Sequence, residues 1–142
     1  MTVAQAQAGT CSIMIEQHQE VTAFQVGQAI DSSMLASRDL ELTKVQDVGS
    51  EQFDFSLSIE ASRQNTSTPS YVILSVSSQK LLNLIYGPSA KKCDATSDDF
   101  FSTFSFSKAT YKETAQELIQ KLPPCEVLKE IEKQAILMAN CQ

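Results

Sequence analysis

Phe53-Asp54-Phe55-Ser56-Leu57-Ser58-Ile59-Glu60 is the stretch that decides the fold class. Its apolar side chains alternate with polar ones, which predicts a β-strand with one buried face and one face in water. Strand-like patterns also occur at residues 11–15 and 40–48, and in the alternation of Phe104 and Phe106 with serines. Residues 71–76 and 81–86 are more continuously apolar, which favours a central hairpin covered on both faces. Together these segments predict an antiparallel sheet of about five strands.

Apolar residues at helical spacing surround this sheet. Residues 20–34 predict a helix, and Ser97 is expected to cap a short helix that runs through Phe101. Thr110 and Glu113 form a capping box, and the prolines at 123–124 separate the helix that follows from a second one. The residues expected on the buried side of that second helix are Val127, Leu128, Ile131, Ala135 and Met138. The sequence therefore predicts the α+β class, with flanking helices and two helices at the C-terminus.

The composition is typical of a globular protein and does not favour binding to nucleic acid. Hydrophobic residues make up 42% of the 142 residues and charged residues 20%. Eleven basic and 17 acidic side chains give a net charge of −6, which disfavours nucleic acid and anionic membranes as partners. The apolar runs are only a few residues long, whereas crossing a bilayer takes about 20. We therefore expect no membrane insertion.

Residues 2–8 contain two overlapping Ala-x-Ala patterns, which are typical of the cleavage end of a secretory signal. We expect residues 1–8 to be a flexible remnant of a signal-peptide end, and residues 9–142 to form a single α+β domain. Export to the periplasm, or secretion, also agrees with an even number of cysteines. A cytosolic protein with four buried thiols and an ordinary flexible terminus is the alternative.

The four cysteines are Cys11, Cys93, Cys125 and Cys141, and they include no closely spaced pair of the kind that holds structural zinc. Cys125 and Cys141 lie 16 positions apart on one predicted helix. This spacing corresponds to about 24 Å, far beyond the limit of about 7 Å for a disulfide. Two pairings remain: Cys11–Cys125 with Cys93–Cys141, or Cys11–Cys141 with Cys93–Cys125. A single bridge with two free thiols is a third possibility.

Residue types that support catalysis are scarce. His18 is the only histidine, and its polar neighbours indicate a solvated surface position. The chain contains no glycine-rich phosphate loop, nucleotide fingerprint or nucleophile elbow. Asp94, Asp98 and Asp99 could bind calcium or act as paired carboxylates, but negative charge at a helix start explains the last two more simply. We therefore expect no enzymatic activity, cofactor or metal.

Leu81-Leu82-Asn83-Leu84-Ile85-Tyr86, Gly87-Pro88 and, after a gap, Phe100-Phe101-Ser102-Thr103-Phe104 resemble the closing segment of PsbP/DcrB-like domains. The resemblance covers roughly residues 20–107. It implies an α/β/α sandwich and a non-catalytic role, because members of this family are mostly assembly factors, accessory subunits and chaperone-like binders, many of them exported. The family has no shared catalytic residues to carry over.

Three binding functions agree with these features. In the first, the protein is an inhibitor or a toxin-neutralising immunity protein, whose acidic residues bind a basic protein. The first 37 residues contain no lysine or arginine, so their charge has one sign. The candidate partner-binding residues are Glu16, Glu20, Asp31, Asp94, Asp98 and Asp99. The simpler alternative is that the net charge only keeps a small exported protein soluble.

In the second function, the protein is an accessory or assembly factor of an envelope or photosynthetic-type complex, as the family resemblance implies. In the third, it carries a small apolar ligand between the sheet and the helices. The candidate lining residues are Phe53, Phe55, Phe100, Phe101, Phe104 and Phe106, which also occur at ordinary core spacings. A cavity above about 300 Å³ would favour this third function.

Overall fold

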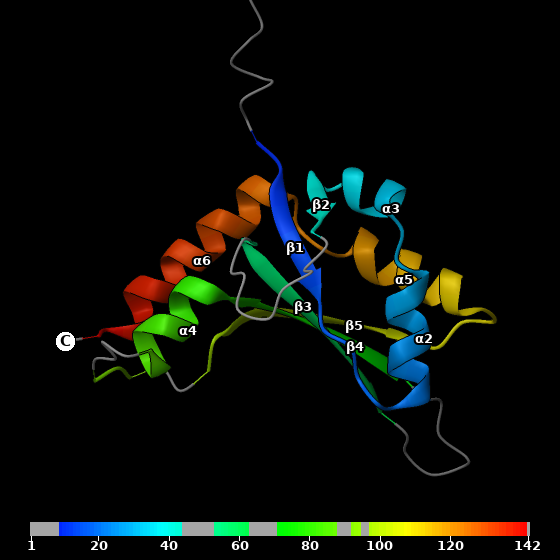
Figure 1. Cartoon of the computed structure of the whole chain (residues 1–142), viewed down its shortest axis with the longest axis horizontal. Coiled ribbons are helices and arrows are strands. Elements are labelled where there is room, and N and C mark those ends of the chain that lie inside the picture. The colour runs from blue at the N-terminus through cyan, green and yellow to red at the C-terminus, as the bar shows by residue number, and fades with distance from the viewer. Residues whose placement is uncertain (1–8, 44–52, 63–70, 88–91, 95–96, 142) are drawn as a thin grey trace, which may run out of the picture.

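The computed structural model describes residues 9–43, 53–62, 71–87, 92–94 and 97–141 (Figure 1). In chain order, its elements are β1 (Cys11–Ile15), α2 (Val21–Ala29), α3 (Ser32–Ala36), β2 (Leu40–Leu42), β3 (Phe55–Ser62), β4 (Tyr71–Ser78), α4 (Gln79–Tyr86), β5 (Asp99–Phe106), α5 (Tyr111–Gln120) and α6 (Cys125–Ala139). The predicted α+β class, with a five-stranded sheet, flanking helices and two C-terminal helices, is confirmed.

The sheet has the strand order β2-β1-β3-β4-β5 and is mixed. The two long ladders, β3–β4 and β4–β5, are antiparallel, as predicted. β1, however, pairs in parallel with both β2 and β3. The helices α2 and α3 connect β1 to β2, and such a helical crossover returns the chain in the same direction. A fully antiparallel sheet was therefore the wrong expectation for this edge.

Three predicted elements differ from the structure. Residues 79–86 form the helix α4, which Ser78 caps by accepting a hydrogen bond from the N–H of Leu81 at 3.2 Å. A short apolar run fits a strand and a buried helix equally well, so the periodicity could not separate them. The predicted helix at 97–101 is absent, because β5 begins at Asp99. The predicted helix over 20–34 is two helices, since Asp31 caps a new one.

The first predicted strand is confirmed as β1, and the segment that decides the fold class is confirmed as β3, whose Phe55, Leu57 and Ile59 are buried. Of the strand predicted over 40–48, residues 40–42 form β2, and residues 44–48 lie outside the described part of the chain. The capping box is confirmed at the start of α5, where the N–H of Glu113 donates to Thr110 Oγ1 at 3.1 Å.

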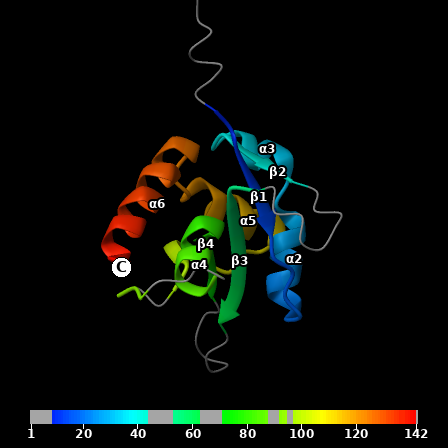
Figure 2. The ribbon, with the colours of Figure 1, turned by 60° about the vertical axis from the view of Figure 1, so that its left-hand side comes forward.

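The hydrophobic core lies on one face of the sheet. Leu57 is paired with Val76 and Ile59 with Leu74, and all four side chains are fully buried. Side chains of α2, α3, α5 and α6 pack into the same core. Figures 1 and 2 show the helices in two groups, with α4 and α6 at one end of the strands and α2 and α5 at the other.

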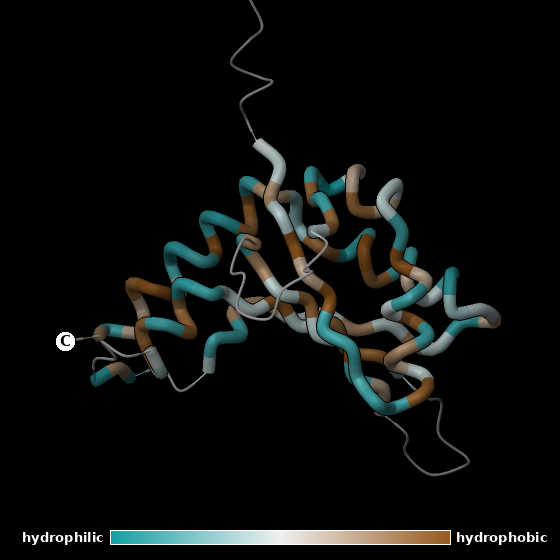
Figure 3. Tube along the Cα trace, in the orientation of Figure 1, coloured by the Kyte–Doolittle hydropathy of each residue, from teal (hydrophilic) through white to brown (hydrophobic). Residues whose placement is uncertain are grey.

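The buried side of α6 differs in part from the prediction. Leu128 is fully buried, but Met138 is 79% exposed and Val127 is 44% exposed. The buried residues of this helix are Cys125, Leu128, Glu132 and Ala139. Hydrophilic and hydrophobic residues alternate along α6 (Figure 3), and its apolar residues include the exposed Val127, Leu137 and Met138. Periodicity indicates an apolar stripe, and only the neighbouring elements determine how much of it is covered.

Two disulfides join α6 to the rest of the domain. Cys11 at the start of β1 is bonded to Cys125 at the start of α6, and Cys93 before β5 is bonded to Cys141 just after α6. This is the first of the two predicted pairings, and all four cysteines are bonded. Among the described residues, no helix has the length and apolarity that crossing a membrane requires.

Candidate functional site

The face of β3, β4 and β5 that points away from the core is exposed or partly exposed in the described chain, except at Ser56 and Ser77, which are buried. Successive side chains of a strand point to opposite faces, so the residues between the core positions share this surface. We call it the open face, and its residues are Ser56, Ser58, Glu60, Tyr71, Ile73, Ser75, Ser77, Asp99, Ser102, Phe104 and Phe106. The α/β/α sandwich implied by the resemblance would cover this face with helices. In the described chain, Ile73 and Ser75 of β4 are partly exposed.

One end of the open face is acidic. Asp99 lies opposite Ser77, which lies opposite Ser56, and the hydroxyl of Ser56 donates to Glu16 at 3.1 Å. A shift of register at Val76/Ser77 allows Asp99 to occupy this position. Three of the six predicted binding residues, Glu16, Asp98 and Asp99, therefore lie in one neighbourhood.

The pKa of Asp99 is raised above its usual value. Partial burial raises this pKa most, and the charges of Asp98, Glu16 and Glu60 raise it further. Glu60, which was not predicted, lies farther along β3 on the same face, opposite Ile73 and in the row of Phe104. No lysine or arginine among the described residues forms an ion pair with these four carboxylates. Within the described residues, the carboxylates at this end of the face therefore have no cationic partner.

The other three predicted residues have structural roles. Glu20 accepts a hydrogen bond from the N–H of Ala23 at 2.8 Å and caps α2. Asp31 caps α3, and the hydrogen bond from the N–H of Met34 is the main cause that lowers its pKa. The carboxylate of Asp94 accepts from the amide of Asn140 at 3.1 Å, beside the Cys93–Cys141 disulfide. Glu20, Asp31 and Asp94 therefore each form a hydrogen bond within the domain.

The other end of the open face is aromatic. The ring of Phe104 lies 6.1 Å from that of Tyr71 and 5.9 Å from that of Phe106, measured between centroids. Phe104 is 52% exposed and Phe106 is 54% exposed, while Ser105 between them is buried. The strand therefore presents its phenylalanines to solvent and its serine to the interior. Core spacing alone predicted the reverse for these residues.

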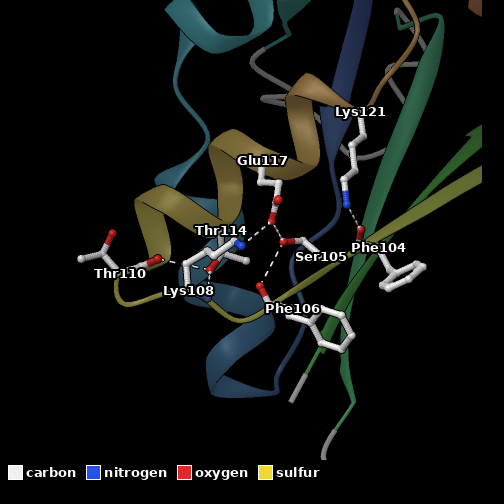
Figure 4. Close-up of polar contacts among 8 residues, drawn as sticks. All are labelled: Phe104, Ser105, Phe106, Lys108, Thr110, Thr114, Glu117 and Lys121. Carbon is white, nitrogen blue, oxygen red and sulfur yellow. Dashed lines mark hydrogen bonds and ion pairs between the residues drawn. The ribbon is translucent and has the colours of Figure 1, made fainter. Parts of the chain in front are cut away.

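Contacts with α5 hold β5 with its phenylalanines facing solvent and Ser105 facing the interior (Figure 4). The hydroxyl of Ser105 donates to the carboxylate of Glu117, which also forms an ion pair with Lys108 at 3.2 Å. Lys121 donates to the carbonyl oxygen of Phe104 at 2.7 Å, and its ammonium lies 5.5 Å from the centre of the Phe104 ring. These contacts satisfy the buried serine, and the two phenylalanine rings point away from α5.

His18 also contacts the open face. Its Nε2 lies 3.0 Å from Oγ of Ser58, a pairing that a hydrolase could use to activate a serine. Such a mechanism also requires preorganised N–H donors for the oxyanion, but Ser58 lies inside a strand paired along the β3–β4 ladder. No carboxylate among the described residues bonds the histidine ring. The pair therefore supplies a hydrogen bond between the β1–α2 connection and β3.

Two clefts indent the domain, and the first of them shares Glu16 with the acidic end of the open face. One, of about 700 Å³, lies beside α2 and is lined by residues such as Ile15, Phe24 and Leu42. The other, of about 480 Å³, lies between α4, α6 and the start of β3. The six phenylalanines proposed as one ligand lining do not share a cavity. Phe53 and Phe55 line the second cleft, Phe100 and Phe101 pack against the core, and Phe104 and Phe106 lie on the open face.

Within the described ranges, no group of three or more histidine, cysteine, aspartate or glutamate side chains could hold a metal ion. Comparison with known proteins identifies no relative. No protein-family model matches the chain, no curated protein matches it in sequence, and no solved structure matches its fold. Function must therefore be argued from the geometry of the molecule.

Replacing Asp99 with asparagine is expected to stabilise the domain more at pH 7 than at pH 3. The raised pKa means that Asp99 contributes stability below the unfolded-state value of about 4 and loses it as the pH rises through the folded-state value. Asparagine stays neutral at both pH values, so the variant does not lose this stability as the pH rises. Urea unfolding of both proteins at the two pH values measures the effect.

Asp31→Asn is the matched control, because the lowered pKa of Asp31 gives the opposite sign. This carboxylate contributes stability above the unfolded-state pKa and loses it as the pH falls. Asparagine keeps a side-chain oxygen for the cap and removes only the charge. An Asp99→Asn effect that is equal at pH 3 and pH 7 would show that neither burial nor the neighbouring carboxylates raise the pKa of Asp99.

Proposed function

We propose that the chain is a non-enzymatic, exported protein-binding module that uses the open face to bind a basic protein, as an inhibitor or a toxin-neutralising immunity protein does. One observation carries the proposal: in the described part of the chain, one sheet face combines carboxylates without a cationic partner at one end with half-exposed phenylalanines at the other. Protein interfaces use aromatic residues for binding energy and complementary charge for steering and specificity.

The acidic end defines the partner's chemistry. Glu16, Asp98 and Asp99 at this end, together with Glu60 farther along the face, would attract lysine and arginine side chains. The net charge of −6 extends that attraction over a longer range. The aromatic end offers Phe104 and Phe106 to apolar side chains of the same partner. The two disulfides support export, because such bonds persist in oxidising compartments.

The alternative function, an accessory or assembly factor of an envelope or photosynthetic-type complex, would use the same face differently. Such a subunit stays bound through apolar area and therefore resists salt. An inhibitor that relies on charge for recognition loses affinity as salt screens its carboxylates. Salt dependence thus distinguishes the two.

The test is an affinity capture from the envelope fraction of the source organism, at low salt and at about 0.5 M salt, where the Debye length is only a few ångströms. We expect one basic protein, captured in stoichiometric amount and lost at high salt. Capture of several membrane-complex subunits that persist at high salt would instead support the assembly function.

A matched pair of variants assigns the binding to the open face. Glu60→Lys with Asp99→Lys reverses two charges on the face, while Glu41→Lys with Glu130→Lys reverses two exposed charges elsewhere. Both variants change the net charge equally. Against the purified partner, we expect the first to weaken binding on the order of 100-fold and the second by less than about threefold. Equal losses would mean that only net charge matters, and would overturn the assignment.

A further inference from the structure

The cleft between α4, α6 and the start of β3 is lined by groups of three chemical kinds. Phe53, Phe55, Ile136 and Leu137 give it an apolar wall. Glu132 places a carboxylate in it, and the residue is only 7% exposed. The volume of about 480 Å³ falls in the range of small-molecule sites. None of these residues belongs to the open face.

One of the two carboxylate oxygens of Glu132 accepts a hydrogen bond from the described part of the chain. Its Oε2 accepts the hydroxyl proton of Ser78, and Ser78 Oγ in turn accepts the N–H of Leu81 at 3.2 Å. Every fully buried side-chain nitrogen or oxygen among the described residues has a hydrogen-bond partner. Oε1 has no such bond within this part of the chain, so it meets the cleft rather than the packed interior. An anionic acceptor is therefore presented to whatever enters.

Three lysines line the same cleft: Lys80 from α4, and Lys129 and Lys133 from α6. None of them lies within ion-pair distance of Glu132 in the described structure. A simple anion would be drawn to these lysines but repelled by Glu132. A simple amine would be drawn to Glu132 but repelled by the lysines. A molecule that carries both a positive and a negative group can pair with Glu132 and with the lysines at the same time.

We propose that this cleft binds a small apolar zwitterion, namely an α-amino acid with an apolar side chain. Its ammonium group donates to Oε1 of Glu132, and its carboxylate accepts from Lys129 and Lys133. Its side chain packs on Phe53, Ile136 and Leu137. Binding pairs a carboxylate that is already largely removed from water, which makes the contact stronger than the same pair in solution. The site is independent of the protein-binding function proposed above.

Isothermal titration of the whole chain with four probes tests the proposal. L-leucine carries both charges, N-acetyl-L-leucine lacks the ammonium charge, L-leucinamide lacks the carboxylate, and octanoate has only the carboxylate and an apolar chain. We expect L-leucine to bind at least about 10-fold more tightly than each of the others, since every lost ion pair is worth about 1.4 kcal/mol or more. Octanoate or N-acetyl-L-leucine binding as tightly as L-leucine would overturn the proposal, as would no binding of L-leucine.

Variants assign the contacts. Glu132→Gln keeps an acceptor for Ser78 but removes the charge, and it should weaken L-leucine binding at least about 10-fold. Should this variant fail to fold, Lys129→Gln with Lys133→Gln tests the other half of the site with exposed residues. Lys108→Gln with Lys112→Gln, near the start of α5 and outside the cleft, is the control with the same charge change. Equal binding by the cleft and control variants would contradict the proposed contacts.

Discussion

Replacing Cys11 and Cys125 together with alanine is expected to lower the free energy of unfolding by about 5 kcal/mol. The bond has a sequence separation of 114, so breaking it releases the larger of the two disulfide loops, since the other has a separation of 48. A domain of this size is typically stable by about 5–15 kcal/mol, so the loss removes much of its stability. Chemical denaturation without reductant measures the change.

The control for this prediction is the same pair of proteins in reductant. Once the wild-type bonds are reduced, the difference between wild type and variant should shrink to the small effect of two buried thiols. A peptide map without reductant should also recover Cys11 linked to Cys125 and Cys93 linked to Cys141. Recovery of Cys11 linked to Cys141 would show that the other pairing forms.

Leu128→Ala is expected to cost about 2–5 kcal/mol, because this side chain is fully buried in the core. The sequence pattern placed Leu128 and Met138 on the same buried side of one helix. The structure separates them, since Met138 is 79% exposed. Met138→Ala should therefore change the free energy of unfolding by less than about 0.5 kcal/mol.

Urea denaturation of the two single variants measures the contrast within one helix. Both substitutions remove a large apolar side chain and leave alanine, which has the highest helix propensity. Helix propensity therefore cannot explain a large difference between them. Similar losses for both variants would mean that the C-terminal half of α6 packs against another part of the chain.

The candidate site was only partly accessible from the sequence. Glu16, Asp98 and Asp99 were identified as acidic residues, but so were Glu20 and Asp31, which cap helices. In a sequence, an acidic residue just before a helix looks the same whether its carboxylate caps that helix or binds a partner. Phe104 and Phe106 were missed as surface residues because alternation shows that two faces differ, and not which one is buried. Here the contact of Ser105 with Glu117 decides the direction.

What the sequence by itself determined is local. Alternation at 53–60 defined a strand, Thr110 and Glu113 defined a helix start, and helical length ruled out a Cys125–Cys141 bond. Tertiary structure alone decided the helical state of residues 79–86, the parallel pairing of β1, the disulfide partners and the exposed face of β5. The physical reason is that periodicity and capping act within a few residues, whereas these four features depend on contacts between segments distant in the chain.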